Sequence, residues 1–131
     1  MFPAGYILRI KHKEWVQQVF DSMSYYTSIY RKWATGQIII FAHKTDRGDS
    51  FIGFGIIGTT REFADLSEEE KRLCEQHGWK TAIDLTFMKK FSKPLPVKET
   101  FLAETLRRGK FLHGLALDDS QIRELLSQAG E

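Results

Sequence analysis

The segment from residue 24 to residue 33 contains the side chains best suited to recognising a ligand. Its sequence, SYYTSIYRKW, holds four aromatic rings and two cations within ten residues. Aromatic faces stack on unpaired bases, and Arg and Lys side chains bind phosphates. So much aromatic area on a polar loop is costly unless it is used, which favours a ligand-facing surface. The alternative is that these rings cover one end of the core.

Gly53, Gly55 and Gly58 form the pattern G-x-G-x-x-G, which matches the dinucleotide-binding fingerprint in its letters. That fingerprint places its glycines in a turn between a strand and a helix. Here the glycines lie inside an apparent strand, and no apolar helix follows them. We therefore expect no dinucleotide and no other cofactor. Gly53 and Gly55 share one face of the strand, where a helix, another backbone or a flat ligand can approach closely.

The four histidines and the single cysteine form no metal-binding or catalytic pattern in the sequence. No two of His12, His43, His77 and His113 have the i, i+4 spacing of a helical metal site, so we expect no metal. Cys74 has acidic neighbours, which disfavour a thiolate and argue against a nucleophile. Because the sequence contains no recognisable catalytic constellation, it favours a protein that is not an enzyme.

Charge is uneven along the chain, although the formal net charge is only +2. Residues 80–110 carry eight Lys or Arg against three Asp or Glu, whereas residues 61–75 carry three against six. A basic stretch of this kind permits an anionic partner, and binding to single-stranded nucleic acid should then weaken with salt. Ordinary solvated surface is the alternative. The candidates for contact with a nucleic-acid backbone are Arg31, Lys32, Lys89, Lys90 and Lys93.

Composition and length predict a single domain over residues 1–131. Hydrophobic residues make up 42% of the chain, enough for a core at this size. We expect no contact with a membrane, because the chain has no apolar run long enough to span one and no signal-peptide pattern at its start. The lone cysteine fits a reducing compartment, so we expect a cytoplasmic protein. The oligomeric state is not indicated.

The predicted elements follow the order β-α-β-β-α-β-α-α. The predicted strands cover residues 5–10, 37–44, 51–57 and a stretch within 79–91. The predicted helices cover residues 12–22, 67–77 and 99–107, with a last helix that starts at Asp118 or Asp119. The segment 24–33 is predicted as a loop. This order favours a small mixed sheet or a partly open barrel, because a doubly wound fold needs repeated βα units.

Local signals predict where two of these elements end and which face the last helix buries. Ser67 and Glu70 have the spacing of a capping box, which starts a helix, and Gly78 should end that helix. The sequence KPLP at residues 93–96 should break the preceding strand. The last helix should turn Ile122 toward the core, together with Leu125 and Leu126.

Two apolar strands and the C-terminal tail carry a family resemblance. Residues 36–41 (GQIIIF) form a glycine followed by an apolar strand, and residues 51–57 (FIGFGII) form a strand punctuated by glycines. In residues 101–126 a short apolar stretch precedes a final helix. In these features the chain resembles the EVE family of the PUA-like superfamily.

The resemblance implies an α+β fold, a PUA-like pseudo-barrel of mixed, mostly antiparallel strands with peripheral helices. It also implies RNA, single-stranded nucleic acid or a modified base as partner, bound in an aromatic pocket at one end of the barrel, without a fixed catalytic set. By position it assigns ligand binding to Tyr25, Tyr26, Ser28, Trp33, His43 and Lys44.

Two other functions remain open at this point. PUA-like relatives of the ASCH type suggest a small hydrolase or transferase for a nucleotide-like substrate, which would need Lys44 near Asp84 or Glu62. The acidic helix could instead serve a protein-interaction module. An aromatic cleft would favour base recognition, a cluster of lysine and carboxylates would favour the enzyme, and a filled barrel end would favour the interaction module.

Overall fold

Six strands form one mixed sheet in the computed structural model, which describes residues 2–103 and 111–131. Their order is β2-β5-β4-β3-β1-β6; β1 and β3 are parallel and the other neighbours are antiparallel. The strands are β1 (Gly5–Arg9), β2 (Ser24–Thr27), β3 (Ile38–Thr45), β4 (Gly48–Glu62), β5 (Thr81–Pro96) and β6 (Leu115–Leu117). The helices are α1 (Lys13–Ser22), α2 (Glu68–His77) and α3 (Asp119–Gln128), with short 3-10 turns at Phe63–Asp65 and Val97–Glu99. The predicted α+β architecture is confirmed.

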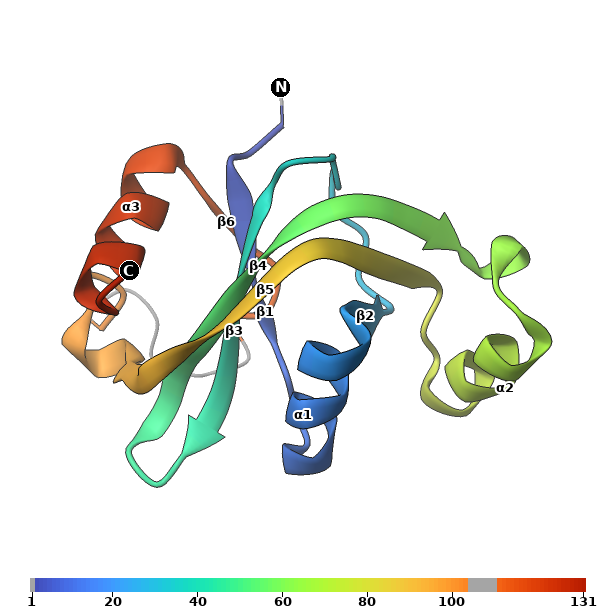
Figure 1. Cartoon of the computed structure of the whole chain (residues 1–131), viewed down its shortest axis with the longest axis horizontal. Coiled ribbons are helices and arrows are strands. Elements are labelled where there is room, and N and C mark those ends of the chain that lie inside the picture. The colour runs from blue at the N-terminus through green and yellow to red at the C-terminus, as the bar shows by residue number, and fades with distance from the viewer. Residues whose placement is uncertain (1, 104–110) are drawn as a thin grey trace.

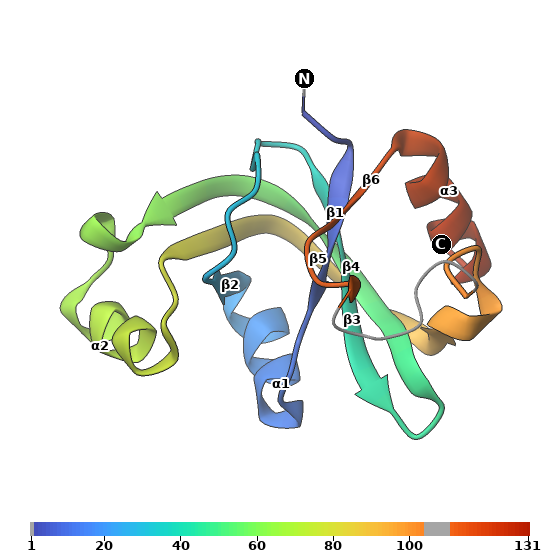
Figure 2. The same ribbon diagram turned by 180° about the vertical axis from the view of Figure 1, so that it is seen from behind.

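The paired strands β4 and β5 are much longer than the others and bend strongly along their length (Figure 1). Their pairing register shifts at three places between Phe51 and Thr59, as expected of β-bulges, which bend a ladder and increase its twist. The far end of the β4–β5 ladder extends past β1 and β3, where β2 pairs with β5 and α2 follows β4 (Figures 1 and 2).

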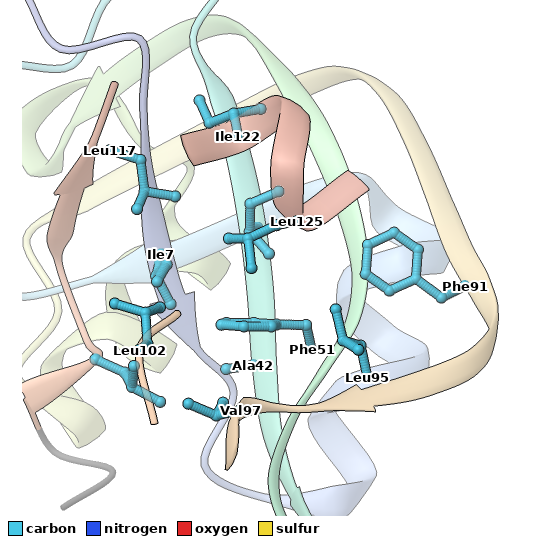
Figure 3. Packing of buried hydrophobic residues seen from close by; sticks show 12 residues of the cluster. Ile7, Ala42, Phe51, Phe91, Leu95, Val97, Leu102, Leu117, Ile122 and Leu125 are labelled. Carbon is cyan, nitrogen blue, oxygen red and sulfur yellow. The ribbon is translucent and has the colours of Figure 1, made fainter. Parts of the chain in front are cut away.

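Apolar side chains are buried on both faces of the central strands. On one face, Ile122 and Leu125 of α3 pack against Ile7, Phe51 and other sheet residues (Figure 3). On the opposite face, α1 covers a second cluster that includes Leu8 of β1. Successive residues of a strand point to opposite faces, so a strand covered on both sides must be apolar throughout. This explains the continuous run IIIFA in β3.

Gly53 provides the close approach that the glycine spacing predicted. A Cβ atom at this position would lie 2.6 Å from Cζ of Phe20 in α1 and 2.5 Å from the carbonyl oxygen of Lys89. The ring of Phe20 thus occupies the space that a side chain on β4 would take, which fixes α1 on the sheet.

The local signals for helix ends are confirmed. The Ser67 side chain accepts from the Glu70 N–H, and the Glu70 side chain accepts from the Ser67 N–H, which completes a capping box at the start of α2. Gly78 ends the helix with φ +73°, a conformation that favours glycine. At α3, Asp118 is the N-cap, with its side chain accepting from the Gln121 N–H.

Several predicted boundaries are wrong. The first four residues of the supposed loop form strand β2, which pairs with β5 at the sheet edge. Strand β5 continues through the KPLP sequence. Residues 91–94 lie between the pairs Gly53↔Lys90 and Phe51↔Leu95 and form a bulge. Pro94 is tolerated there because it has no backbone N–H to donate to the ladder and a bulge needs none. The three-residue strand β6 was not predicted. Of the helix predicted at 99–107, Glu99 ends the 3-10 turn, residues 100–103 form a bend and turns, and residues 104–107 lie outside the described residues.

Candidate functional site

A cleft of about 530 Å³ is lined by residues of α1, α2 and the edge strand β2, among others. The ribbon in Figure 2 shows where these three elements lie. It takes side chains from the end of β1, from both helices, from β2 and from the segment before β6. Its main polar and aromatic side chains are Arg9, Lys11, His12, Trp15, Ser24, Tyr26, His77, Trp79 and His113. Within the described part of the chain, none of the lining side chains is an Asp or a Glu. The cleft is therefore aromatic and basic.

Trp15, Tyr26 and Trp79 form what we call the aromatic wall of the cleft. The ring centroid of Trp79 lies 5.3 Å from that of Trp15 and 5.7 Å from that of Tyr26, with the Tyr26 ring inclined by 12° to it. His77 stacks on Trp79 at 4.4 Å, and His12 meets Trp15 edge-on at 4.2 Å. Rings in mutual contact hold one another in place, so the wall is preformed between α1, β2 and the segment after α2.

A polar network of Ser24, Tyr26, Arg61, Glu70 and Asp84 fixes this wall to the sheet. Arg61 donates to Asp84 at 2.6 and 3.0 Å and to Glu70 at 3.0 Å. The Tyr26 hydroxyl donates to Glu70 at 2.6 Å, and the Ser24 hydroxyl donates to Asp84 at 2.7 Å. Both carboxylates are thus held by partners within the network.

Ionisation in the network follows from these contacts. The hydrogen bonds from Arg61 and then from Tyr26 lower the pKa of Glu70 to about 2. Burial, followed by the hydrogen bond to Glu70, raises the pKa of Tyr26 to about 12. At neutral pH the carboxylate is therefore ionised and the phenol is neutral, so the phenol stays a hydrogen-bond donor to Glu70.

Another part of the cleft is lined by the end of β1, where the backbone of Arg9 is held. The buried hydroxyl of Tyr25 donates to the Arg9 carbonyl oxygen at 2.6 Å, which ties β2 to the end of β1. Burial raises the pKa of Tyr25, so this donor stays protonated. The Arg9 guanidinium pairs with Asp49 at 2.7 Å, which compensates its charge.

His113 and Lys11 also line this part of the cleft. The Arg9 N–H donates to Nδ1 of His113 at 3.0 Å. Burial, then the charges of Arg31 and Arg9, lower the pKa of His113, so its ring is neutral at neutral pH. Lys11 is exposed and makes no hydrogen bond or ion pair with the residues that the structure describes.

The six predicted ligand-binding residues lie in different places. Tyr25 and Tyr26 line the cleft. Trp33 is half-buried, meets the Tyr6 ring edge-on at 5.0 Å and lines a second hollow of about 440 Å³, beside β4 and β5. Ser28 is exposed just after β2.

His43 and Lys44, the other two predicted ligand-binding residues, stand near the end of β3. His43 Nδ1 lies 2.8 Å from the carbonyl oxygen of Ile10 and so donates to it. Lys44 is exposed and pairs in register with Asp49. Neither residue is among those that line the two hollows.

The predicted backbone-contacting residues lie on more than one surface. Arg31 and Lys32 line the second hollow. Lys89 forms an ion pair with Glu131, and Lys90 donates to Gln17 of α1 at 2.9 Å. Lys93 is exposed in the bulge of β5.

The lysine–carboxylate cluster that an enzyme would need does not form around Lys44. Lys44 pairs with Asp49 beside the β3–β4 turn, whereas Asp84 pairs with Thr59. Asp49 and Thr59 are ten positions apart along β4, roughly 30 Å at the rise of an extended strand. Glu62 lies further still along β4.

Sequence reasoning missed the residues that complete the cleft. Trp15 fitted the apolar face of a helix, and Trp79 fitted the start of a strand. Their meeting depends on the bend of the β4–β5 ladder, which no local pattern encodes. The one available signal was position in the chain. Trp79 directly follows the helix-ending Gly78, and His12, whose ring contacts Trp15, directly precedes α1.

Two further observations concern metal sites and membrane-spanning helices. Within residues 2–103 and 111–131, no group of three or more His, Cys, Asp or Glu side chains is placed to hold a metal ion. No helix in the same ranges is long and apolar enough to cross a membrane.

Solved structures with the same architecture identify the fold. A crystal structure of an ASCH protein from Zymomonas mobilis matches with a TM-score of 0.65 over 92% of this chain and 92% of that chain, at 16% sequence identity. The fold is PUA-like. A crystal structure of a Pseudomonas syringae protein matches with a TM-score of 0.62 over 94% of this chain and 97% of that chain, at 17% identity. The predicted PUA-like fold is thereby confirmed, and at these identities the likeness concerns the fold alone.

Comparison of the sequence gives no corresponding match. No protein-family profile matches it, and neither does any curated protein.

Proposed function

We propose that this chain is a non-catalytic recognition domain that binds RNA, or a modified base within it, by inserting an unpaired base into the cleft between α1 and α2. The observation that carries the proposal is the aromatic wall of Trp15, Tyr26 and Trp79 beside a basic rim. Base stacking on an aromatic side chain contributes roughly 1–3 kcal/mol per base.

The size and charge of the cleft support this proposal. Pockets for small ligands typically enclose about 300–1,000 Å³, so a volume of about 530 Å³ has room for one nucleotide. A nucleic-acid strand is anionic, and carboxylates on the rim would repel it. The described rim instead carries Arg9 and Lys11, while the nearby Glu70 and Asp84 are held by Arg61.

The proposal uses part of the residue set predicted from the sequence. Tyr26 belongs to the aromatic wall, and Tyr25 fixes the backbone of Arg9. For Ser28, Trp33, His43 and Lys44, a role in ligand binding stays a prediction. Membership of the EVE family within the PUA-like group also stays a prediction, since the structural neighbours include an ASCH protein.

The enzymatic alternative has less support from the site. One structural neighbour is an ASCH protein, and the ASCH group is the one that suggested a hydrolase or transferase. The similarity of this chain to that neighbour concerns the fold alone. Asp84, one of the two carboxylates that it could use, is bound by Arg61 and Ser24. We therefore base the proposed function on binding.

The test is a fluorescence-anisotropy titration of the full chain with labelled single-stranded RNA at low salt. Trp15→Ala and Trp79→Ala should each weaken binding about tenfold, because each removes part of the stacking surface. Trp33→Ala distinguishes the two hollows: if the base lies in the cleft, this variant keeps its affinity, and the prediction that Trp33 binds the ligand is then wrong. Circular dichroism confirms that each variant is folded.

Three results would argue against the proposal. The first is the absence of RNA binding at low salt. The second is wild-type affinity in both folded cleft variants. The third is a loss of affinity in Trp33→Ala alone, which would move the ligand to the second hollow.

A further inference from the structure

We propose that the end of the cleft formed by Lys11 and His113 binds a phosphate group, so that the cleft selects a phosphorylated nucleotide over a free base or nucleoside. This inference rests on the proposed function and adds the chemical class of the ligand. It concerns the part of the cleft lined by the segment after β1 and by the segment before β6.

The hydrogen bond at Nδ1 determines which atoms of His113 remain for a ligand. The Arg9 N–H can only donate, so Nδ1 of His113 must accept and carries no proton. The remaining ring nitrogen of a neutral imidazole, Nε2, then carries the proton. Because the ring lines the cleft, it presents a donor and no free acceptor there. A donor of this kind binds ligand oxygen atoms, such as those of a phosphate.

The charges around His113 favour an anion at the same place. The Arg31 guanidinium donates to two carbonyl oxygens, of Gly114 at 2.8 Å and of Tyr30 at 2.7 Å, and it forms no ion pair with a carboxylate in residues 2–103 and 111–131. Lys11 has no ionic partner among the described residues. Asp49 pairs with Arg9, so among the described residues near His113 the charges of Lys11 and Arg31 are left without an ionic partner.

The surroundings also keep His113 neutral. Its burial and the charges of Arg31 and Arg9 lower its pKa, so the ring keeps the Nδ1 acceptor that Arg9 needs. The positive charge that attracts an anion therefore comes from Lys11 in the cleft and from Arg31, which lines the second hollow but binds Gly114 next to His113. The directional hydrogen bond comes from His113.

A nucleotide matches this division of the cleft. Its base is flat and suits the aromatic wall, whereas its phosphate is an anion with acceptor oxygens only. A free base or nucleoside would leave Lys11 and the Nε2–H of His113 without a partner. We therefore expect the phosphate to increase affinity, both in a free monophosphate and in a strand.

The experiment is isothermal titration calorimetry of the full chain with the four ribonucleosides and with their 5′- and 3′-monophosphates. At least one monophosphate should bind about tenfold more tightly than its nucleoside, the gain expected from one charge-assisted contact. Lys11→Ala and His113→Asn should each reduce that ratio. Asn can still accept from the Arg9 N–H but lacks the distal donor. Arg123→Ala, on α3, removes the same charge away from the cleft and should keep the ratio.

The outcomes separate this inference from the proposed function. If nucleosides bind as tightly as monophosphates, the phosphate site is wrong and base recognition stands. If monophosphates are preferred but both folded variants keep the preference, the phosphate lies elsewhere and the inference is wrong. If only oligonucleotides bind, the same variants are compared on a short RNA, where an unchanged affinity overturns the inference. If no nucleoside, nucleotide or RNA binds, both proposals fail.

Discussion

The two ends of the β4–β5 ladder are held in different ways. At one end, Phe51, Phe91 and Leu95 belong to an apolar cluster beneath α3 (Figure 3). At the other end, Arg61 and Asp84 belong to the polar network beneath α2, and the adjacent apolar cluster is small. The first end depends on apolar burial, and the second on hydrogen bonds of defined direction.

This difference explains why the cleft lies at the α2 end. A close-packed apolar cluster fills space and leaves no room for a ligand. Hydrogen bonds between charged groups orient side chains without filling the space beside them, and here they hold Tyr26 at the cleft. Removing side chains from the two ends should therefore affect different properties.

The largest expected effect is on stability, at the α3 end. Leu125 is 1% exposed, so Leu125→Ala should lower the free energy of unfolding by about 2–5 kcal/mol, through lost burial and the cavity left behind. RNA affinity per folded molecule should stay the same. Urea denaturation measures the first quantity and titration the second. Leu126→Ala, at a half-buried neighbour on the same helix, should cost clearly less. Equal costs would show that α3 packs differently.

A smaller effect on stability, now coupled to binding, is expected at the α2 end. Arg61→Ala leaves Glu70 and Asp84 without their shared cation. It should lower the free energy of unfolding by about 1–2 kcal/mol, a value reduced because the arginine side chain is 33% exposed. RNA affinity should also fall, because Glu70 loses the partner that orients it toward Tyr26.

Arg72→Ala is the matched control for Arg61→Ala, because Arg72 is an exposed arginine of α2 outside the polar network. Thermal melting and RNA titration of both variants make the comparison. If Arg61→Ala loses stability but keeps full affinity, the network supports the fold without positioning the cleft.

The comparison also shows which features a sequence can predict. The ends of α2 were predicted because Ser67, Glu70 and Gly78 act on backbone groups within one turn of the helix. The buried strand at Ile38–Thr45 was predicted because its apolar run reflects burial on both faces. In both cases a few neighbouring residues carry the physical cause.

The cleft could be predicted only in part because its causes are not local. Tyr25 and Tyr26 were predicted as ligand-binding residues, but the polar segment around them concealed strand β2. Trp15 and Trp79 meet only because bulges bend the β4–β5 ladder, and such register shifts depend on the pairing of two strands. The same bulging accommodates Pro94 inside β5, where the sequence predicted a break.

The smallest effect is expected from the pH dependence of the α2 end. In the folded protein the pKa of Glu70 is about 2, below its ordinary value of 4.5, so the fold favours the ionised carboxylate. This contribution to stability is present above about pH 4.5 and is lost as the pH falls toward 2. Glu70→Gln cannot titrate, so its free energy of unfolding should fall less than that of the wild type between pH 6 and pH 3. We expect a difference of about 1 kcal/mol, discounted for partial exposure.

Chemical denaturation at several pH values measures this difference. Asp84, whose pKa is also lowered, titrates in both proteins and shares Arg61 with Glu70, so the difference between the two curves measures Glu70 together with its coupling to Asp84. Glu75→Gln provides the control, because Glu75 is an exposed glutamate of α2 outside the polar network, and its curve should run parallel to that of the wild type. Parallel curves for Glu70→Gln and the wild type would mean that the Arg61–Glu70 pair does not hold the α2 end. The contrast between the two ends of the ladder would then rest on Asp84 alone.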